Sequence, residues 1–560
     1  MKILGFDTET INGKCRLIGL SNGTHFIVRS WEDIALFMRR CDGLSLVAFN
    51  ADYDIQSLMV YLPKAVQIRL VKGIPTEYEG FMLYYVPKKY FRFDNNWIYD
   101  VFQFYGMGLN RAAKKYLGEQ KLDVDSSQIT EENIYTPKVI EYCIQDAVLV
   151  SRLFLKFHES LPKELKKTKP ISPAFYSFHY FKDEITGNKL SKAINNLIRP
   201  AFHGGRFEIL EKGPFKNLHV YDVTSAYPHE IMQLHSIKGA DFLRVPQYLP
   251  NATYSFYYIK VHIPDKFVSP LCFKNKTLCI YPVGDYEGLV TKKEYEAVMS
   301  LNPKIEWGFH AFCPSNKPFA EKMSYVFKKK STEQNPLAWK LIANSCYGRT
   351  CMKTPKWTGD AVIDEEIPNT FTDEDGNIFF QYEDIGSSNF IYASEITANT
   401  RLRMYESIKR WPDAVVAVQT DSLISKKPLP LPVSLSLGEW KEEIWEEAYL
   451  IGSGVYFYKT EGEWKCKFRG FNFRGEMVEN LLDRIFSSNE KTIEFESVKR
   501  YSIQESLRLH NDEVANQILQ VGKKLNLNFD RKRVWLDSWK SGKELRTKRI
   551  SSLAIPLLNA

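Results

Sequence analysis

Two sets of acidic side chains in this chain of 560 residues are spaced so that each set could hold metal ions. The first set lies in the N-terminal quarter and comprises Asp7 and Glu9 in FDTET, Asp54 in FNADYD and Asp146 in YCIQD. The second comprises Asp222 in YDVTSAYP and Asp421 in VQTDS. Clustered carboxylates need cations to neutralise them, and a pair of metal ions can drive in-line displacement at phosphorus. The two sets therefore indicate a chain that both cuts and forms phosphodiester bonds.

Local periodicity predicts how neighbouring members of the first set meet. Asp7 and Glu9 lie two residues apart in a predicted strand, so both carboxylates face the same side. Tyr142 and Asp146 lie one turn apart in a predicted helix and share one face. A tyrosine there can orient the attacking water while the aspartate binds metal. Asp54 and Asp146 come from distant segments, which the fold must bring to the strand.

The elements that must position these side chains follow from apolar patterns and turn residues. We predict strands over 2–7, 14–19, 45–49, 217–223 and 414–418, helices over 137–158 and 393–410, a helical stretch over 319–347 broken at Pro336, and an acidic hairpin over 359–380 with its turn at Asp375-Gly376. A Pro/Lys-rich stretch at 161–173 is typical of a domain boundary. The mixture of strands and helices predicts an α/β protein, and its length predicts several domains.

Composition excludes several classes of protein. With 44 % hydrophobic and 25 % charged residues the chain is typical of a folded globular protein, and no apolar run approaches the roughly 20 residues of a membrane span. We identify no signal peptide, and nine cysteines without a C-x-x-C motif favour neither a zinc site nor a disulfide framework. Residues 499–549 carry 13 Lys/Arg against 6 Asp/Glu, which indicates contact with a phosphate backbone, densest at Arg531, Lys532 and Arg533.

The ordered motifs D-x-E, N-x-x-Y-D and Y-x-x-x-D resemble the Exo I, II and III motifs of proofreading 3′–5′ exonucleases of the DEDD type, which have a ribonuclease H-like fold. This resemblance implies that the four acids of the first set are metal ligands and that Tyr142 assists the water. It also implies that Thr10 and Asn50 hold the frayed single-stranded 3′ end. Asp52 matches no ligand position, and we interpret it as a surface or local hydrogen-bonding residue.

YDVTSAYP resembles motif A of family B DNA polymerases, with Ala226 in place of the usual leucine, and KLIANSCYG resembles motif B. The resemblance implies that Asp222, with the adjacent Val223, binds metal and that Tyr227 lies under the sugar, where it leaves little space for a 2′-hydroxyl. The nucleotide-binding residues implied by motif B are Lys340, Asn344 and Tyr347, spaced along one helical face. The run Lys328–Lys330, with Lys328 as our candidate, either adds phosphate contacts or is a solvated charge run.

Motif C departs from the family pattern D-T-D and reads Gln419-Thr420-Asp421. The resemblance implies that Asp421 binds metal and that Thr420 lies at the DNA. In the family, the first aspartate of the pattern does not bind the metal itself but orients the residues that do. The amide of Gln419 can still form a hydrogen bond although it carries no charge. We therefore expect polymerase activity to survive this change.

Two further motifs resemble the protein-primed branch of the family. AFHGGRFE is similar to its Y-x-G-G motif with Phe202 replacing tyrosine, and Gly204 and Gly205 would let backbone approach the template closely. GSGVYFYK supplies Tyr456 of the thumb motif K-x-Y, but Gly454 stands where lysine is expected. The candidates for the missing charge are Lys459, Lys467 and Arg469.

The resemblance to this branch also rests on spacing. Exo I begins at residue 7, so we expect the domain that precedes it in cellular enzymes to be missing. About 118 residues separate Asp222 from Lys340, and about 80 separate Lys340 from Asp421. Such gaps hold terminal protein regions 1 and 2 in the protein-primed branch. The expected domains are an exonuclease (1–165), the first part of the palm with a region 1-like insertion (195–310), fingers (311–350), a region 2-like insertion (351–390), the second part of the palm (391–445), and the thumb with a basic C-terminal region (446–560).

The sequence thus predicts a replicative DNA polymerase with a proofreading exonuclease, encoded by a virus or plasmid and primed by a terminal protein. We expect two Mg²⁺ ions per site, with Mn²⁺ as a substitute, and template, primer and deoxynucleotides as partners. We also expect a monomer in the host cytoplasm without membrane contact. One alternative is synthesis from a nucleic-acid primer or from no primer. Another is a nuclease whose polymerase half only binds DNA.

Overall fold

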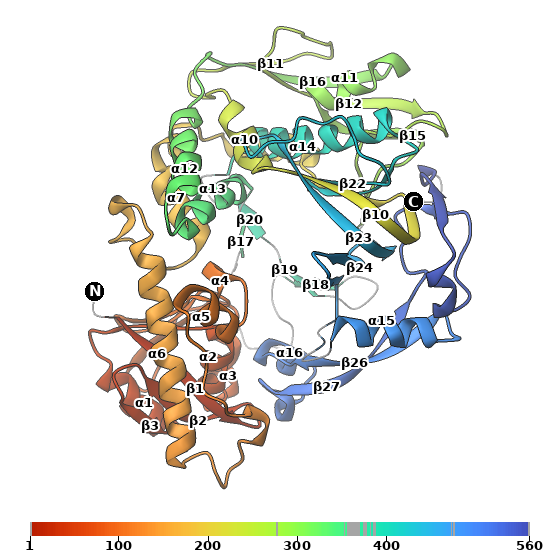
Figure 1. Ribbon diagram of the computed structural model, residues 1–560. Coiled ribbons are helices and arrows are strands. Elements are labelled where there is room, and N and C mark those ends of the chain that lie inside the picture. The colour runs from red at the N-terminus through yellow and green to blue at the C-terminus, as the bar shows by residue number, and fades with distance from the viewer. Residues whose placement is uncertain are drawn as a thin grey trace.

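The computed structural model describes residues 3–275, 278–351, 353–355, 370–372, 378–380, 382–384, 388–471, 473 and 477–557. Two large sheets dominate it, one in an N-terminal unit and one at the centre of the chain, and helical segments join them (Figure 1). The fold is therefore α/β with several units, as predicted. None of the helices in the described ranges is both long and apolar enough to cross a bilayer.

The N-terminal unit is an eight-stranded sheet in the order β3-β2-β1-β4-β8-β7-β6-β5, flanked by helices. Only the pairs β1–β4 and β4–β8 are parallel. Its strands are β1 (Ile3–Ile11), β2 (Lys14–Leu20), β3 (His25–Ile27), β4 (Ser45–Ala48), β5 (Thr76–Tyr78), β6 (Phe81–Val86), β7 (Tyr90–Phe93) and β8 (Asn96–Asp100). Its helices are α1 (Trp31–Arg40), α2 (Ala51–Met59), α3 (Lys64–Val71), α4 (Phe102–Tyr105), α5 (Leu109–Leu117) and α6 (Pro137–Glu159).

Helix α6 packs directly on β1 and β2 because two glycines leave room for it. A Cβ added to Gly5 would lie 1.8 Å from the Ala147 carbonyl oxygen, and one added to Gly19 would lie 2.8 Å from Cys143 Sγ. This close approach brings the helix that carries Tyr142 and Asp146 against the strand that carries Asp7 and Glu9. The predicted helix and strands of this unit are confirmed.

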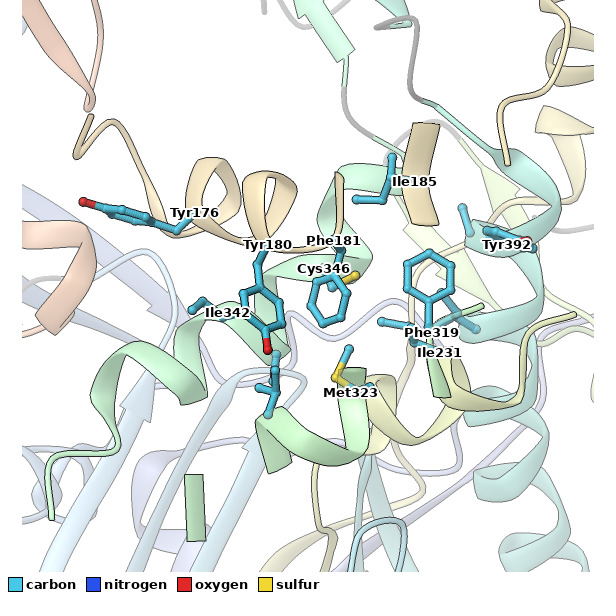
Figure 2. Packing of buried hydrophobic residues seen from close by; sticks show 14 of the residues in the cluster. Tyr176, Tyr180, Phe181, Ile185, Ile231, Phe319, Met323, Ile342, Cys346 and Tyr392 are labelled. Atoms are coloured by element: carbon cyan, nitrogen blue, oxygen red, sulfur yellow. The ribbon is translucent and has the colours of Figure 1, made fainter. Parts of the chain in front are cut away.

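The Pro/Lys-rich stretch leads into helices that pack tightly with the next unit. They are α7 (Pro173–Tyr180), α8 (Lys182–Gly187) and α9 (Lys192–Ile198). Figure 2 shows Tyr180 and Phe181 among side chains of α12 (Ala320–Thr332) and α13 (Leu337–Thr350), with Ile231 of α10 (Ala226–Gln233) and Tyr392 of α14 (Phe390–Arg410) in the same cluster. The predicted break at Pro336 is confirmed, since this residue precedes α13.

The central sheet is antiparallel and nine-stranded, with the main order β25-β24-β23-β10-β22-β21-β9. Its strands are β9 (Arg206–Ile209), β10 (Glu211–Val223), β21 (Val415–Thr420), β22 (Ser422–Ser425), β23 (Trp440–Gly452), β24 (Val455–Thr460), β25 (Glu463–Phe468), β28 (Val534–Trp535) and β29 (Ile550–Leu553). The sheet continues past residue 445, where we expected the palm to end. It does so because β23 pairs with β10, β24 with β23 and β25 with β24.

A smaller four-stranded sheet lies between Asp222 and α12 in the sequence, where the first insertion was expected. Its order is β11-β16-β12-β15, and its strands are β11 (Asp241–Arg244), β12 (Tyr254–Ile263), β15 (Gly284–Thr291) and β16 (Lys304–Phe312). The hairpin of β13 (Phe273–Asn275) and β14 (Leu278–Ile280) and helix α11 (Lys292–Ala297) belong to the same stretch. It has its own apolar cluster around Tyr257, Ile259 and Tyr286.

The second expected insertion is described only in part. Strand β17 (Lys353–Pro355) pairs with β20 (Tyr382–Asp384), and β18 (Thr370–Thr372) pairs with β19 (Ile378–Phe380), both antiparallel. This pairing agrees with the predicted hairpin. Its turn at Asp375-Gly376 lies outside the described residues.

The C-terminal hairpin connects the central sheet back to the N-terminal unit (Figure 1). It consists of β26 (Thr492–Arg500) and β27 (Ile518–Asn526), with α16 (Ile503–Arg508) at its tip and α15 (Val478–Ser487) before it. Near its base, Phe495 and Leu525 pack with Phe457 of β24. At its tip, Ile503 is fully buried in the apolar core of the N-terminal unit.

Candidate active sites

The four acids of the first set converge from β1, α2 and α6, as the motifs predicted. Ligand atoms of Asp7 and Glu9 lie within 4.8 Å of each other and of Cys143 Sγ. The hydroxyl of Thr8 donates a hydrogen bond of 2.6 Å to Asp54 Oδ1, which fixes that carboxylate beside β1. Asp146 is only 2 % exposed. The packing of α6 on β1 thus assembles one buried acidic site.

Burial and mutual repulsion raise the pKa values of this site. Burial, followed by the charges of Asp146 and Asp54, raises the pKa of Asp7 well above its usual range. Burial is also the main cause that raises the pKa of Glu9 to about 8 and that of Asp54 to about 7. Asp146 Oδ1 is buried and has no hydrogen-bond partner among the described residues. Several crowded carboxylate oxygens with an unsatisfied buried acceptor fit a hard divalent cation.

Lys121 forms an ion pair with one of these acids. Its Nζ lies 2.5 Å from Asp146 Oδ2 and 4.8 Å from the centre of the Tyr142 ring. Burial lowers the pKa of Lys121 and Asp146 raises it, with a net upward shift, so the side chain stays charged. No motif marked this lysine, and its position follows only from how the segment after α5 folds over α6.

The residues expected to hold a 3′ end lie at one edge of this site. Thr10 Oγ1 is 2.5 Å from the hydroxyl of Tyr53, a residue that the motif analysis did not assign a role. Asn50 is exposed, adopts a left-handed conformation with φ of 64° and precedes α2. Asp52 is buried and accepts hydrogen bonds from Tyr85 and from the Lys88 backbone, so its local hydrogen-bonding role is right and the surface placement is wrong.

The second acidic set meets at the edge of the central sheet. Asp222 is next to last in β10 and pairs with Ser422, so it lies beside the turn that holds Asp421. The Val223 amide donates to the Asp421 carbonyl oxygen, while Ser422 Oγ at 2.6 Å and Lys441 Nζ at 2.9 Å contact the Asp222 carboxylate. Burial, and then repulsion from Asp222, raises the pKa of Asp421 to about 6. Two adjacent carboxylates, both half-buried, again fit a divalent cation.

The turn of motif C is held by contacts on both sides. Thr420 adopts φ of 64°, and a Cβ added to Gly205 would lie 2.6 Å from its Cγ2, so glycine is required there for packing. Gly204 has open space around it. Gln419 Oε1 accepts a hydrogen bond of 2.7 Å from Tyr456, while its buried Nε2 has no partner among the described residues.

Side chains from α10, α12 and α13 gather next to the second acidic set. The rings of Tyr227 and Tyr347 are 4.6 Å apart, and Lys340 and Asn344 are exposed on α13. Of the lysine run, Lys330 and not Lys328 reaches motif A, because its Nζ lies 2.7 Å from Ser225 Oγ. Burial, and then the neighbouring Lys340 and Lys441, lowers the pKa of Lys330. Lys328 is exposed, and Lys329 forms an ion pair with Glu333.

A family model described as DNA polymerase type B, organellar and viral, matches residues 81–423. The chain belongs to this family. It is 25 % identical over 549 residues to a DNA polymerase of Acidianus bottle-shaped virus (isolate Italy/Pozzuoli), with 86 % of this chain and 77 % of the relative covered. It is 23 % identical over 367 residues to a probable DNA polymerase of Ascobolus immersus, covering 58 % of this chain and 30 % of that protein.

Solved structures of Phi29 DNA polymerase share the fold of this polymerase. The complex with primer-template DNA and incoming nucleotide substrates matches with a TM-score of 0.65 at 14 % identity, covering 94 % of this chain and 99 % of that one. An orthorhombic crystal form matches with a TM-score of 0.66, also at 14 % identity, over 94 % and 100 % of the two chains. The chain is thus a DNA-directed DNA polymerase with an exonuclease-type unit followed by palm, fingers and thumb, and family B polymerases generally use divalent metal ions.

Two of the three basic residues at 531–533, which were expected to bind DNA, contact other parts of the protein. Lys532 Nζ donates to the Phe207 carbonyl oxygen at 2.8 Å, and Arg533 Nη1 lies 3.1 Å from a carboxylate oxygen of the fully buried Glu208. Arg531 is exposed. Charge density alone did not distinguish the three residues, because it does not record which carboxylates and carbonyls the fold places beside them.

Tyr456 and Lys467, both proposed from the thumb motif, lie opposite each other on β24 and β25. Tyr456 is 4 % exposed and donates a hydrogen bond to the motif C glutamine, so it is buried in the central sheet beside that turn. Lys467 is exposed. Both residues belong to the central sheet because β24 pairs with β23 and β25 with β24.

Arg401 holds the loop between the exonuclease-type unit and the palm, and no motif predicted it. This fully buried side chain on α14 donates to the carbonyl oxygens of His203 and Gly204 at 2.7 and 3.1 Å. Its other terminal nitrogen lies 2.5 Å from Glu294. A lone arginine in a long helix has no sequence signal for this function.

Proposed function

We propose that this polymerase joins DNA synthesis to 3′–5′ proofreading, with two Mg²⁺ ions at each of its two acidic sites. The observation that carries the proposal is the convergence of carboxylates from distant segments at two separate places. Asp222, Val223 and Asp421 would hold the ions of one site, and Asp7, Glu9, Asp54 and Asp146 those of the other. When bound, the ions activate the attacking oxygen and stabilise the leaving oxygen of an in-line displacement.

In the synthesis site the protein's own groups bind and orient the nucleotide. Lys330 and Lys340 place positive charge where a triphosphate is expected, and burial together with the neighbouring Lys340 and Lys441 lowers the pKa of Lys330. The ring of Tyr227 packs against Tyr347 and limits the space beneath the sugar. Gln419 and Tyr456 support the motif C turn from behind through their hydrogen bond.

In the proofreading site Lys121 forms an ion pair with Asp146, and Tyr142 lies beside both residues. Tyr142 orients the attacking water, and Lys121 offsets the negative charge that crowds the site. Thr10, Asn50 and Tyr53 hold the single-stranded 3′ end. Tyr142 lies on α6 and Tyr53 on α2, and both helices pack against β1.

The pKa shifts predict how Mg²⁺ changes stability with pH. Glu9 and Asp54 have folded pKa values of about 8 and about 7, against ordinary values of 4.5 and 3.8. At pH values between the ordinary and the folded pKa, the folded chain holds more protons than the unfolded chain. Without metal, the free energy of unfolding therefore falls as the pH rises from about 4 to about 8. Mg²⁺ offsets this repulsion, and we expect it to raise Tm by about 3–5 °C more at about pH 8 than at about pH 5.

Differential scanning fluorimetry with and without Mg²⁺ measures this effect. In an Asp7→Asn/Asp54→Asn variant the pH-dependent part of the Mg²⁺ shift should become smaller, because only Glu9, Asp146 and the second site remain, whereas the exposed Asp42→Asn variant should behave as wild type. An Mg²⁺ shift in the double variant equal to that of wild type would show that the ions bind elsewhere.

We further propose that synthesis starts on a hydroxyl group of a terminal protein. Support comes from the separate four-stranded sheet between motifs A and B, at the place where the protein-primed branch has its first insertion. The AFHGGRFE motif, whose Gly205 packs on the motif C turn, adds to it. The runner-up is priming by nucleic acid, or initiation with no primer, by the same catalytic groups.

Initiation is tested by incubating the polymerase with a radiolabelled deoxynucleotide, template DNA without oligonucleotide, and an extract of the cells that make it. Protein priming gives a labelled polypeptide whose label resists nuclease and is lost on proteinase treatment. A labelled product that migrates as free DNA before and after proteinase treatment would establish one of the alternatives.

A further inference from the structure

The tip of the thumb hairpin is built into the exonuclease domain rather than resting on its surface. Ile503 is fully buried in a core that includes Ile55 and Leu58 of α2, and its amide donates to Gln56 Oε1 at 2.9 Å. In the turn between β1 and β2, a Cβ added to Gly13 would lie 2.4 Å from the Ala515 carbonyl oxygen. The contact therefore has the packing of a protein interior.

Two polar side chains at this tip bind main-chain oxygens of the exonuclease domain. Arg500, the last residue of β26, donates from Nη2 to the Asp52 carbonyl oxygen at 2.7 Å and from Nε to Asn516 Oδ1 at 3.0 Å. Asn516 is fully buried and donates from Nδ2 to the carbonyl oxygens of Gly13 at 3.1 Å and Tyr53 at 3.0 Å. The bonded pair thus joins the start of α2 to the end of β1.

The segment held in this way carries the side chains proposed to bind a 3′ end. The guanidinium of Arg500 lies 5.2 Å from the centre of the Tyr53 ring, and the hydroxyl of Tyr53 is 2.5 Å from Thr10 Oγ1. The metal-binding Asp54 follows Tyr53 directly but has its own support from Thr8. Loss of the tip contacts should therefore disturb Tyr53 more than Asp54.

We propose that Arg500 and Asn516 are positioning residues that hold Tyr53 against Thr10, so that the thumb completes the 3′-end-binding groove of the exonuclease. This inference rests on the proposed proofreading function. The hairpin has its base in the core shared with the palm, so the element that borders the polymerase half also shapes the site that receives the frayed end. The two residues act through Tyr53 and do not touch the reacting atoms.

The test measures hydrolysis of a single-stranded oligonucleotide as a function of its concentration. Arg500→Ala and Asn516→Gly should each raise KM about tenfold and leave kcat within about threefold, because they remove hydrogen bonds and a cation–π contact that orient the groove. Glycine adopts the φ of 58° found at position 516 without strain. Arg500→Lys, which keeps the charge over the ring, should recover part of the affinity.

Lys64→Ala is the matched control, because it removes an exposed ion pair with Asp512 across the same junction and should change neither constant. Loss of kcat without a change in KM, or wild-type KM in both variants, would overturn the proposal. Fluorescence anisotropy of a 3′-labelled oligonucleotide with Ca²⁺ in place of Mg²⁺ measures binding without hydrolysis. Weaker binding by both variants supports the positioning role. Failure of wild type to hydrolyse the oligonucleotide would overturn the proofreading function and leave this binding result intact. Unchanged binding by both variants would overturn the positioning role.

Discussion

Asp421→Asn is expected to abolish primer extension, with a loss on the order of a thousandfold, while degradation of single-stranded 3′ ends continues. The substitution removes a charge that we propose binds metal, and such a charge is worth several kcal/mol of transition-state stabilisation, at about 1.4 kcal/mol for each factor of ten. It should not unfold the palm. Burial and repulsion from Asp222 already disfavour the charge of Asp421, so a neutral side chain of the same shape fits the site.

Single-turnover extension of a primed template by one nucleotide measures this effect without contributions from product release. The matched control is Asp413→Asn, an exposed aspartate just before β21 on the same segment. Its extension rate should equal that of wild type. Extension by Asp421→Asn within about tenfold of wild type would remove this residue from the catalytic group and leave the motif C assignment without its central residue.

Asp7→Asn is expected to remove 3′-end degradation to a similar extent, on the order of a thousandfold, with primer extension unchanged. Burial and the negative charges of all three other carboxylates of the set raise the pKa of Asp7. Asp7 is therefore close to each of the other three acids. Replacing it removes a ligand that the other acids cannot supply. Its neutral form also relieves repulsion, and the exonuclease domain should become more stable without metal.

The measurement is release of the 3′-terminal nucleotide from a labelled oligonucleotide, with misincorporation during extension as a second readout. Asp42→Asn, in an exposed turn after α1, is the control for a nearby lost charge. If Asp7→Asn lowered extension and degradation in parallel, the two sites would not be independent. Persistent degradation would place the nuclease chemistry on other residues.

The acids of both sites could be predicted because local spacing and ordered motifs define them. Asp7 and Glu9 share a face by strand periodicity alone, and Tyr142 and Asp146 share one by helical periodicity. The helix that follows Pro336 and carries motif B could be predicted from the apolar pattern in the same way. In each case the spacing of residues within a single strand or helix determines which side chains share a face. The fold then only has to bring these strands and helices together.

The residues that could not be predicted depend on contacts between distant segments. Lys121 meets Asp146, Arg401 meets the loop at Gly204, and Arg500 meets Asp52, although none of these pairs lies within one motif. Isolated basic residues are common in any sequence, and only tertiary packing selects the few with buried partners. Charge density gave no sign of the ion pair between Arg533 and Glu208 for the same reason, and alternation along β24 and β25 gave no sign that these strands join the central sheet.

The burial of Ile503 has a consequence for how the chain is made. Synthesis proceeds from the N-terminus, and domains generally fold as they emerge from the ribosome. The N-terminal unit lacks part of its core until residues 500–516 have been translated, so apolar side chains of α2 stay uncovered while the segments between are being added. A nascent chain that stalls before these residues would expose these side chains to chaperones and proteases.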